Sequence, residues 1–285
     1  MAIETEKSFT RVTLALDIIG TIAEGRYKGF HELSTIKHRI GLYDTITVED
    51  STVTQLRCSH PSVPLDNTNI CWKALDAVKN ACHIDKNVSI SIEKNIPVFG
   101  GLAGGSANGA STLKLLNKLW DLGLSAGEMM DLGRSVGMDI PYYFIGNTAF
   151  DSESTGILEP IHTSLSFDFV LVIPDFGVST REAYKNIDYN LIARNIEKTG
   201  SMKKAFLANH QDEVIGAIHN DFELSVFKRY PQLQLIKNKL LDLGCVNAVM
   251  SGSGSTIIGI LHQSADGEKI QKEIGYASLI VSSKK

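Results

Sequence analysis

The sequence predicts a mixed protein of the α/β or α+β class, and three observations support this prediction. The 285 residues allow one large domain or two smaller ones. Hydrophobic residues make up 43% of the chain and charged residues 21%, which argues against collagen, coiled coil and long disorder. Segments in which apolar residues alternate are interspersed with segments in which they recur at helical spacing. We therefore expect strands and helices around a sizeable core.

In the first part of the chain, strands are expected before the first helix. Apolar residues alternate from Val12 to Ile18, a half-buried strand pattern that puts Arg11 and Thr13 together on the polar face. A charged, glycine-containing turn follows, and the turn residues Gly41 and Asp44 separate the next two strands. The remaining elements expected here are strands at residues 33–40, 45–53 and 88–93 and a helix at residues 69–82.

In the second part of the chain, helices dominate until two final strands. Apolar residues recur at helical spacing after Ser106, and Pro141 limits the continuation of a later helix. Residues 151–159 are polar and contain glycine, so a boundary between two lobes is expected near residues 150–165. The further elements expected are a helix at residues 125–136, a strand at 169–173, helices between 181 and 243, and strands at 246–249 and 257–261.

The charges of the chain are nearly balanced. Its 28 Lys and Arg against 32 Asp and Glu give a net charge of −4 without a dense basic run, which argues against nucleic acid or an anionic membrane as a partner. Its 4 cysteines show no C-x-x-C spacing, so we expect reduced thiols. No apolar run approaches the ~18 residues of a membrane span, and the first residues do not resemble a signal peptide. These features predict a cytoplasmic protein.

The densest glycine segment lies between a predicted strand and a predicted helix. Glycine lets a backbone approach a ligand closely, and the N–H groups and dipole of a helix N-terminus favour a phosphate. A P-loop is excluded because Ser106 and Ala107 stand where Lys and Ser/Thr are required, and no G-x-G-x-x-G fingerprint fits. The alternative is that the glycines only permit tight helix packing. The segment consists of Gly100, Gly101, Leu102, Ala103, Gly104, Gly105 and Ser106.

Two further features are candidates for chemistry. A second loop of small residues, Ser251, Gly252, Ser253 and Gly254, offers N–H groups and hydroxyls at the end of a predicted strand, although such loops are commonly hairpin turns. Asp139 is an acid in an apolar context after a predicted helix, where it is either a base or simply a cap or turn former.

Three segments together resemble, in order and spacing, the motifs of the GHMP small-molecule kinases. They are residues 97–108, 137–141 and 250–254. The resemblance covers most of the chain and implies a two-lobed α+β fold, with an N-terminal ATP-binding domain at residues 1–155 and a C-terminal ferredoxin-like domain at residues 156–285. It further implies ATP-dependent phosphorylation of a hydroxyl group. The likeness is strongest to members that act on 4-diphosphocytidyl-2-C-methyl-D-erythritol in the non-mevalonate route to isoprenoid precursors.

The resemblance assigns ATP and Mg²⁺ to the first glycine loop. Residues 100–106 would hold the phosphates, and Ser106 would also approach Mg²⁺. Asn69 and Lys94 match positions that line the nucleotide site, and Asp139 matches the base for the acceptor hydroxyl. Because phosphoryl transfer depends mainly on positioning and charge stabilisation, one well-placed carboxylate would suffice.

The resemblance also assigns residues to the acceptor. A cytidine ring would lie between the rings of Phe30 and Tyr184 and be read by His31, for which a structural role is the alternative. The second loop, residues 251–254, would contribute to the same substrate site.

The chain departs from the family in two places. Arg11 and Thr13 stand where the family has Lys and Asn, and Arg11, as the expected partner of the catalytic aspartate, keeps the charge in a rigid planar group. The turn between Gly20 and His31 is longer than in the family, and its Arg26 or Lys28 would be available to an anionic group of a substrate other than the diphosphocytidyl compound. The alternative is a solvated surface loop with incidental charges. These departures keep two alternatives open, a kinase of another small alcohol and a catalytically silent ligand-binding protein.

Overall fold

The computed structural model describes residues 2–25, 28–152, 156–262 and 264–284, which form two compact units. The first unit contains the residues up to Thr10, Leu42–Val98 and Ala103–Ile145, and the second contains Arg11–Gly41, Phe99–Leu102 and the residues from Gly146 onward. The units are interleaved in the sequence because two long strands, β1 (Ile3–Thr21) and β2 (His31–Asp50), each contribute to both. The family resemblance implies two consecutive domains, residues 1–155 and 156–285. This division of the chain stays a prediction.

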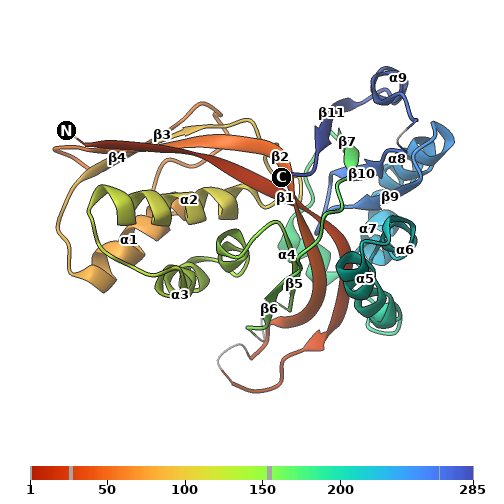
Figure 1. The fold of residues 1–285 in the computed structure, drawn as a ribbon, viewed down its shortest axis with the longest axis horizontal. Helices are drawn as coiled ribbons and strands as arrows, with labels where there is room; N and C mark the ends of the chain where they lie inside the picture. Colours follow the sequence, from red (N-terminus) through yellow and green to blue (C-terminus); the bar gives the residue numbers. More distant parts are fainter. Residues whose placement is uncertain (1, 26–27, 153–155, 263, 285) are drawn as a thin grey trace. The chain divides into compact units, whose positions relative to one another are not determined.

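The first unit contains a sheet and three helices that pack on one another (Figure 1). In this sheet β4 (Val88–Glu93) is antiparallel to the end of β2, from Thr45 opposite Glu93 to Asp50 opposite Val88. A short strand, β3 (Gln55–Cys58), runs parallel to β4. The helices are α1 (Ile70–Cys82), α2 (Gly104–Leu119) and α3 (Ala126–Val136), followed by the 3-10 helix η1 (Ile140–Phe144).

Local signals explain where these helices begin and how closely they approach. Ser125 and Glu128 form a capping box at the start of α3, which satisfies N–H groups at that end. Gly109 lies inside α2, and a Cβ atom at this position would come within 2.5 Å of Ile70 Cγ2. Here, glycine permits close helix packing rather than ligand binding.

The second unit contains a four-stranded antiparallel sheet with the order β11-β7-β10-β9. Helix α8 (Pro231–Asp242) packs on β9 and β10, and α9 (Gly267–Glu273) packs on β11 and β7. The order of elements along the chain, strand, helices, two strands, helix and strand, is the ferredoxin-like βαββαβ pattern. The strands are β7 (Asp168–Ile173), β9 (Asn247–Met250), β10 (Ile257–Ile260) and β11 (Ala277–Ser282).

The second unit also holds short strands on β1 and β2. β8 (His219–Asn220) runs parallel to β1, and β5 (Thr148–Asp151) runs antiparallel to β2 and pairs with β6 (Leu158–Pro160). The further helices are α4 (Thr180–Lys185), α5 (Ile196–Ala208), α6 (Gln211–Gly216) and α7 (Glu223–Arg229).

The structure confirms the α+β class and most expected elements, with two corrections. The strands expected at residues 33–40 and 45–53 are one continuous strand, β2, so the expected turn at Gly41 and Asp44 is wrong. The polar face of β1 is not exposed, because Arg11, Thr13 and Asp17 are all buried. The first difference arises because β4 and β5 pair with the two ends of β2, and the second because neighbouring elements cover the polar face of β1.

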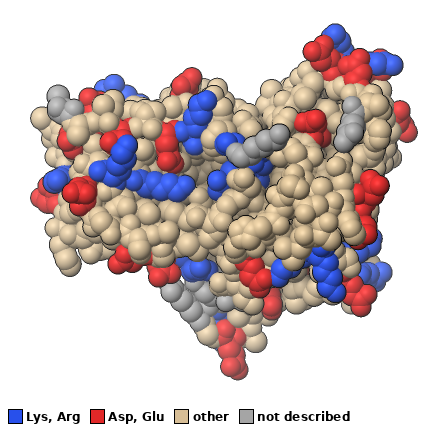
Figure 2. All heavy atoms as spheres, viewed as in Figure 1, with Lys and Arg blue, Asp and Glu red and all other residues tan. Residues whose placement is uncertain are grey.

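Two expectations about the chain as a whole can be compared with the structure. The four cysteines form no disulfide. Among the described residues, no helix has the length and apolar character that crossing a membrane requires. Figure 2 shows Lys and Arg interspersed with Asp and Glu on the face in view.

Candidate active site

The first glycine loop continues into helix α2, whose N-terminus carries no side-chain cap. Ala103 occupies the N-cap position with a φ of 54° and makes no capping hydrogen bond. Gly105, in the first turn, is exposed, and the nearest atom to a Cβ built there would be 3.5 Å away on Ile70. The first N–H groups of a helix lack partners within the helix, so an uncapped first turn suits an anionic ligand. Ser106 lies in the same turn and is partly buried.

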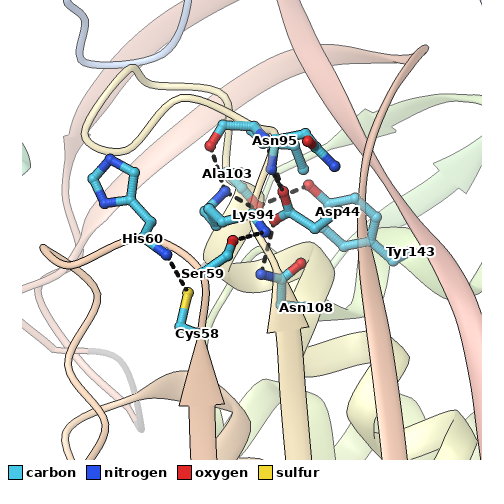
Figure 3. A network of polar contacts seen from close by, with 10 residues as sticks. Asp44, Cys58, Ser59, His60, Lys94, Asn95, Ala103, Asn108 and Tyr143 are labelled. Carbon is cyan, nitrogen blue, oxygen red and sulfur yellow. Dashed lines mark hydrogen bonds and ion pairs between the residues drawn. The ribbon is translucent and has the colours of Figure 1, made fainter.

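The segment before this loop is held by Asp44, which is completely buried (Figure 3). Its Oδ2 atom accepts hydrogen bonds from Lys94 Nζ at 2.8 Å and Asn108 Nδ2 at 2.9 Å. Its Oδ1 atom accepts from the backbone N–H groups of Asn95 and Ile96, at 2.7 and 2.8 Å. A buried carboxylate with four donors fixes the backbone that leads into the loop.

Two residues expected near the nucleotide have structural contacts in the first unit. Lys94 Nζ, beside its ion pair with Asp44, donates to the carbonyl oxygen of Ile96 at 2.5 Å. Asn69 is the N-cap of α1, where its Oδ1 accepts from the N–H of Cys71 at 2.8 Å. These contacts fix both side chains, and their roles toward a nucleotide stay predictions.

Asp139 immediately precedes helix η1 and is partly buried. Its side chain makes no capping hydrogen bond to this helix, which argues against the reading of Asp139 as a simple cap. Helix η1 is tied to the glycine loop within the first unit, because the Tyr143 hydroxyl donates to the carbonyl oxygen of Ala103 at 3.2 Å. Lys114 Nζ in turn donates to the carbonyl oxygen of Tyr143 at 2.9 Å.

In the second unit, residues 100–102 of the first glycine loop lie against the second loop. The Ser251 hydroxyl donates to the carbonyl oxygen of Gly101 at 3.1 Å, and Thr256 N–H donates to that of Gly100 at 3.3 Å. Gly101 has a φ of +73°, and a Cβ atom there would lie 2.1 Å from the Ser251 carbonyl oxygen. The second loop is therefore more than a hairpin turn, since it supports the first.

Arg11 and Thr13 lie side by side on β1, as the strand pattern predicted. Arg11 Nη1 donates to Thr13 Oγ1 at 2.5 Å and to the carbonyl oxygen of Gly101 at 3.4 Å. Both side chains are buried, with 5% and 2% exposure. The guanidinium therefore connects the strand to the first glycine loop.

The second loop is anchored by the side chains of Asn220 and Glu223. Asn220 Nδ2 donates to the carbonyl oxygens of Met250 at 2.7 Å and Gly252 at 2.8 Å. Glu223 Oε1 accepts from the N–H of Met250 at 2.8 Å. Asp221 Oδ2 accepts from the backbone N–H groups of Ile18 and Ala193. Side chains of residues 220–223 thus satisfy backbone groups of β1, of β9, of the second loop and of the connection before α5.

Ser253 of the second loop and Ser255, just after it, also have polar partners in the second unit. Ser253 Oγ lies 2.9 Å from Thr180 Oγ1. Ser255 Oγ donates to the carbonyl oxygen of Phe176 at 2.6 Å. These contacts connect the loop to the first residue of α4 and to the segment before this helix.

The structure brings together the histidine and one of the aromatic residues expected to bind the acceptor. The rings of His31 and Tyr184 are stacked, with centroids 4.3 Å apart and an interplanar angle of 24°. Phe222 meets Tyr184 edge-on at 4.9 Å. Phe30, next to His31 in the sequence, is 52% exposed. Burial lowers the pKa of His31, which favours a neutral imidazole.

The structure leaves part of the expected acceptor loop untested. Arg26 lies outside the described residues, as does its neighbour Tyr27. Lys28 is described and exposed. The contact of this loop with an anionic group therefore stays a prediction.

Several residues of the site were not predicted. Asp44 was interpreted as a turn residue, and the residues around it in the sequence did not indicate that it would accept four hydrogen bonds. Tyr189 contacts His31, but it lies in a polar segment without periodicity, so no local signal indicated it.

The comparisons with known families agree with this geometry. The description "GHMP kinases N terminal domain" matches residues 69–147, and "GHMP kinases C terminal" matches residues 202–278. A curated 4-diphosphocytidyl-2-C-methyl-D-erythritol kinase of Chlorobium phaeobacteroides (strain DSM 266 / SMG 266 / 2430) is 34% identical over 95% of this chain and 92% of its own. One of Clostridium botulinum (strain Eklund 17B / Type B) is 35% identical over 94% of each chain.

Solved structures show the same fold. A crystal structure of 4-(cytidine 5'-diphospho)-2C-methyl-D-erythritol kinase covers 99% of this chain and 100% of its own, with a TM-score of 0.79 and 22% identity. A homoserine kinase from Cytophaga hutchinsonii covers 100% and 97%, with a TM-score of 0.74 and 13% identity. By family match, identity and coverage, the chain belongs to the GHMP kinases and is an ATP-dependent kinase.

Proposed function

We propose that this kinase transfers the γ-phosphoryl group of ATP to a hydroxyl of 4-diphosphocytidyl-2-C-methyl-D-erythritol. The observation that carries the proposal is the stacked pair of His31 and Tyr184, at 4.3 Å. Stacking and imidazole hydrogen bonds suit a cytosine ring, which has a flat face and a polar edge. The names of the curated relatives support the same acceptor. The reaction would serve the non-mevalonate route to isoprenoid precursors in the cytoplasm.

ATP is proposed to bind through the first turn of α2. The uncapped N–H groups after Ala103 and the exposed Gly105 suit its phosphates. Among the described residues no three His, Cys, Asp or Glu side chains gather as a ready metal site. Ser106 would contribute a hydroxyl to Mg²⁺, an ion that in kinases is held largely by phosphate oxygens and water. The ion would neutralise charge on the phosphates.

Asp139 is proposed to act as the base. Its carboxylate would accept the proton of the acceptor hydroxyl while the hydroxyl oxygen forms a bond to the γ-phosphorus and the bond to the β-phosphate oxygen breaks. Its position before η1 and the tie between Tyr143 and Ala103 give it a fixed backbone near the loop within the first unit. Positioning of this kind is the main contribution a protein makes to phosphoryl transfer.

Arg11 is proposed to serve as the second catalytic residue, with Thr13 beside it. Its contacts with Thr13 and Gly101 hold the guanidinium in one orientation. A fixed positive group there would stabilise negative charge that develops on the transferred phosphoryl. Thr13 and the second loop, residues 251–254, would line the acceptor site.

We also propose a domain division and an oligomeric state for the protein. Residues 1–155 and 156–285 would form the ATP-binding and C-terminal domains of the family, which is compatible with the matches at residues 69–147 and 202–278. The active form would be a monomer or homodimer, which sedimentation can decide.

The test is ADP release from Mg·ATP with the cytidyl compound, beside a panel of polyols, sugars and their phosphates. We expect turnover on the cytidyl compound only. Asp139→Asn should lower kcat by about 10²-fold or more with ATP binding retained. Asp131→Asn, at an exposed position of α3, is the matched control and should leave turnover unchanged.

Other outcomes would replace the proposal. Activity on a panel member alone would indicate a kinase of another small alcohol. Stabilisation by ATP without ADP release from any acceptor would indicate a silent binding protein. Full turnover in Asp139→Asn would show that another group is the base.

A further inference from the structure

Tyr189 contacts the edge of His31 in the second unit. It lies in the connection between α4 and α5, and its hydroxyl is 2.8 Å from His31 Nε2. The same hydroxyl is 3.4 Å from Thr21 Oγ1, at the end of β1. The rings of Tyr189 and His31 are nearly parallel, with an interplanar angle of 15° and centroids 6.2 Å apart.

Tyr184 and Tyr189 restrain the His31 imidazole in different ways. Stacking on Tyr184 sets the plane of the ring, but a half-turn about the Cβ–Cγ bond would keep that plane and exchange the edges. This terminal torsion of histidine is soft, so stacking alone selects neither orientation strongly. The hydrogen bond to Nε2 distinguishes the two, because a half-turn would remove Nε2 from the Tyr189 hydroxyl.

We propose that Tyr189 is a positioning residue for acceptor recognition: its hydroxyl donates to Nε2 of His31 and so keeps the imidazole proton on Nδ1. This inference rests on the proposed function, in which His31 reads the cytosine. A neutral imidazole has one donor and one acceptor nitrogen, and the hydrogen bond at one nitrogen sets the role of the other. With Nε2 accepting, Nδ1–H is a donor that matches the O2 and N3 acceptors of cytosine.

The surroundings of Tyr189 favour this direction of donation. Burial of His31 lowers its pKa, so the imidazole is neutral near pH 7 and one nitrogen must accept. Thr21 Oγ1 is placed to donate to the Tyr189 oxygen, which leaves the phenolic proton for Nε2. In this direction Thr21 donates to Tyr189 and Tyr189 donates to His31, and successive hydrogen bonds of this kind strengthen one another.

The first test measures the tautomer of His31 in the ligand-free full chain. Long-range ¹H–¹⁵N spectra separate the two nitrogens of a neutral imidazole. We expect the Nδ1–H form in the unaltered protein and a substantial fraction of the Nε2–H form in Tyr189→Phe, which keeps the ring. Thr21→Val is a second variant at the strand end and should give a smaller shift in the same direction. An unchanged tautomer in both variants would overturn the proposal.

The second test measures steady-state kinetics with the cytidyl acceptor. Tyr189→Phe should raise the acceptor KM about threefold to tenfold, the worth of one hydrogen bond, with kcat and the KM for ATP nearly unchanged. Tyr276→Phe is the matched control, since Tyr276 is a surface tyrosine with 41% exposure. An unchanged acceptor KM in Tyr189→Phe, in an enzyme that turns over this acceptor, would overturn the role in recognition.

The two proposals fail in different ways. Absence of turnover in the unaltered protein refutes the proposed acceptor, while the tautomer comparison still decides whether Tyr189 sets the state of His31. Turnover together with an unchanged tautomer and KM refutes the role of Tyr189 alone.

Discussion

The Ser251 hydroxyl donates to the carbonyl oxygen of Gly101 at 3.1 Å, which joins two glycine loops separated by about half the chain. The carbonyl oxygen of Ser251 leaves no room for a side chain at Gly101, because it would lie 2.1 Å from a Cβ atom there. Glycine at this position is therefore required by the neighbouring loop as well as by its own φ of +73°.

Replacement of Gly101 tests this relationship. Gly101→Ala should lower the free energy of unfolding by about 3 kcal/mol or more, because backbone strain adds to a steric clash. Gly123→Ala is the control, since Gly123 has a similar φ of +67° with no atom within 4 Å of its Cβ position. It should cost only about 1–2 kcal/mol. Equal losses in urea denaturation would show that the loops do not depend on this close approach.

The buried pair of Lys94 and Asp44 predicts a second effect on stability. Lys94→Met would leave the Asp44 carboxylate, with 0% side-chain exposure, without its cation, and should cost about 3–5 kcal/mol of unfolding free energy. The control is Lys118→Met, which removes a surface pair with Glu4 in which the lysine side chain is 70% exposed. That substitution should cost less than about 1 kcal/mol. A small loss in Lys94→Met would mean that the N–H groups of residues 95 and 96 suffice to hold Asp44.

His38 predicts that stability falls in mild acid. Burial lowers the pKa of His38 to about 4, and its ring nitrogens contact Thr148 Oγ1 at 2.8 Å and Ser283 Oγ at 2.7 Å. The unfolded chain binds a proton near pH 6.5 while the folded chain does not, so this contribution to stability is present above pH 6.5 and is lost down to about pH 4.

The measurement is the free energy of unfolding against pH, which should lose about 3 kcal/mol over this interval from His38 alone. His38→Gln should flatten the profile in that interval. His162→Gln, at an exposed position, should leave the profile as it is. An unchanged slope in His38→Gln would contradict the assignment.

His219 predicts a change of stability with pH that is opposite in direction to that of His38. Burial disfavours its charged form, but the hydrogen bonds with Asp17 at 3.1 Å and the Ala217 carbonyl at 2.7 Å outweigh this effect and raise the pKa. A raised pKa gives stability that is complete below the unfolded value near pH 6.5 and is lost as the pH rises through the folded value. His219→Gln should therefore remove a decline of stability on the alkaline side. If stability still declined at alkaline pH in His219→Gln, another group would be responsible for the decline.

The sequence predicted those parts of the molecule that local chemistry determines. The alternation in β4 and the helical spacing at residues 69–82 and 125–136 depend on residues a few positions apart, and these elements were predicted. The N-cap at Asn69 and the capping box at Ser125 were not predicted. The side-by-side placement of Arg11 and Thr13 follows from the period of a strand and was also confirmed.

Long-range contacts determined what was missed. β2 continues through Gly41 and Asp44 because β4 and β5 pair with its two ends, and no local pattern encodes those partners. The contact of Tyr189 with His31 joins positions 158 residues apart, so nothing near either residue indicates it.

Residues 220–223 have a consequence for how relatives of this chain are recognised. Asn220, Asp221 and Glu223 each use a side-chain atom to bind backbone groups of other segments, namely Met250, Gly252, Ile18 and Ala193. These three residues therefore indicate how the chain folds around its loops. Their contacts with the backbone do not indicate which alcohol is phosphorylated. A search for these residues would therefore collect proteins of shared architecture. Under the proposed function, sorting them by acceptor would have to compare the positions of His31, Tyr184 and Tyr189.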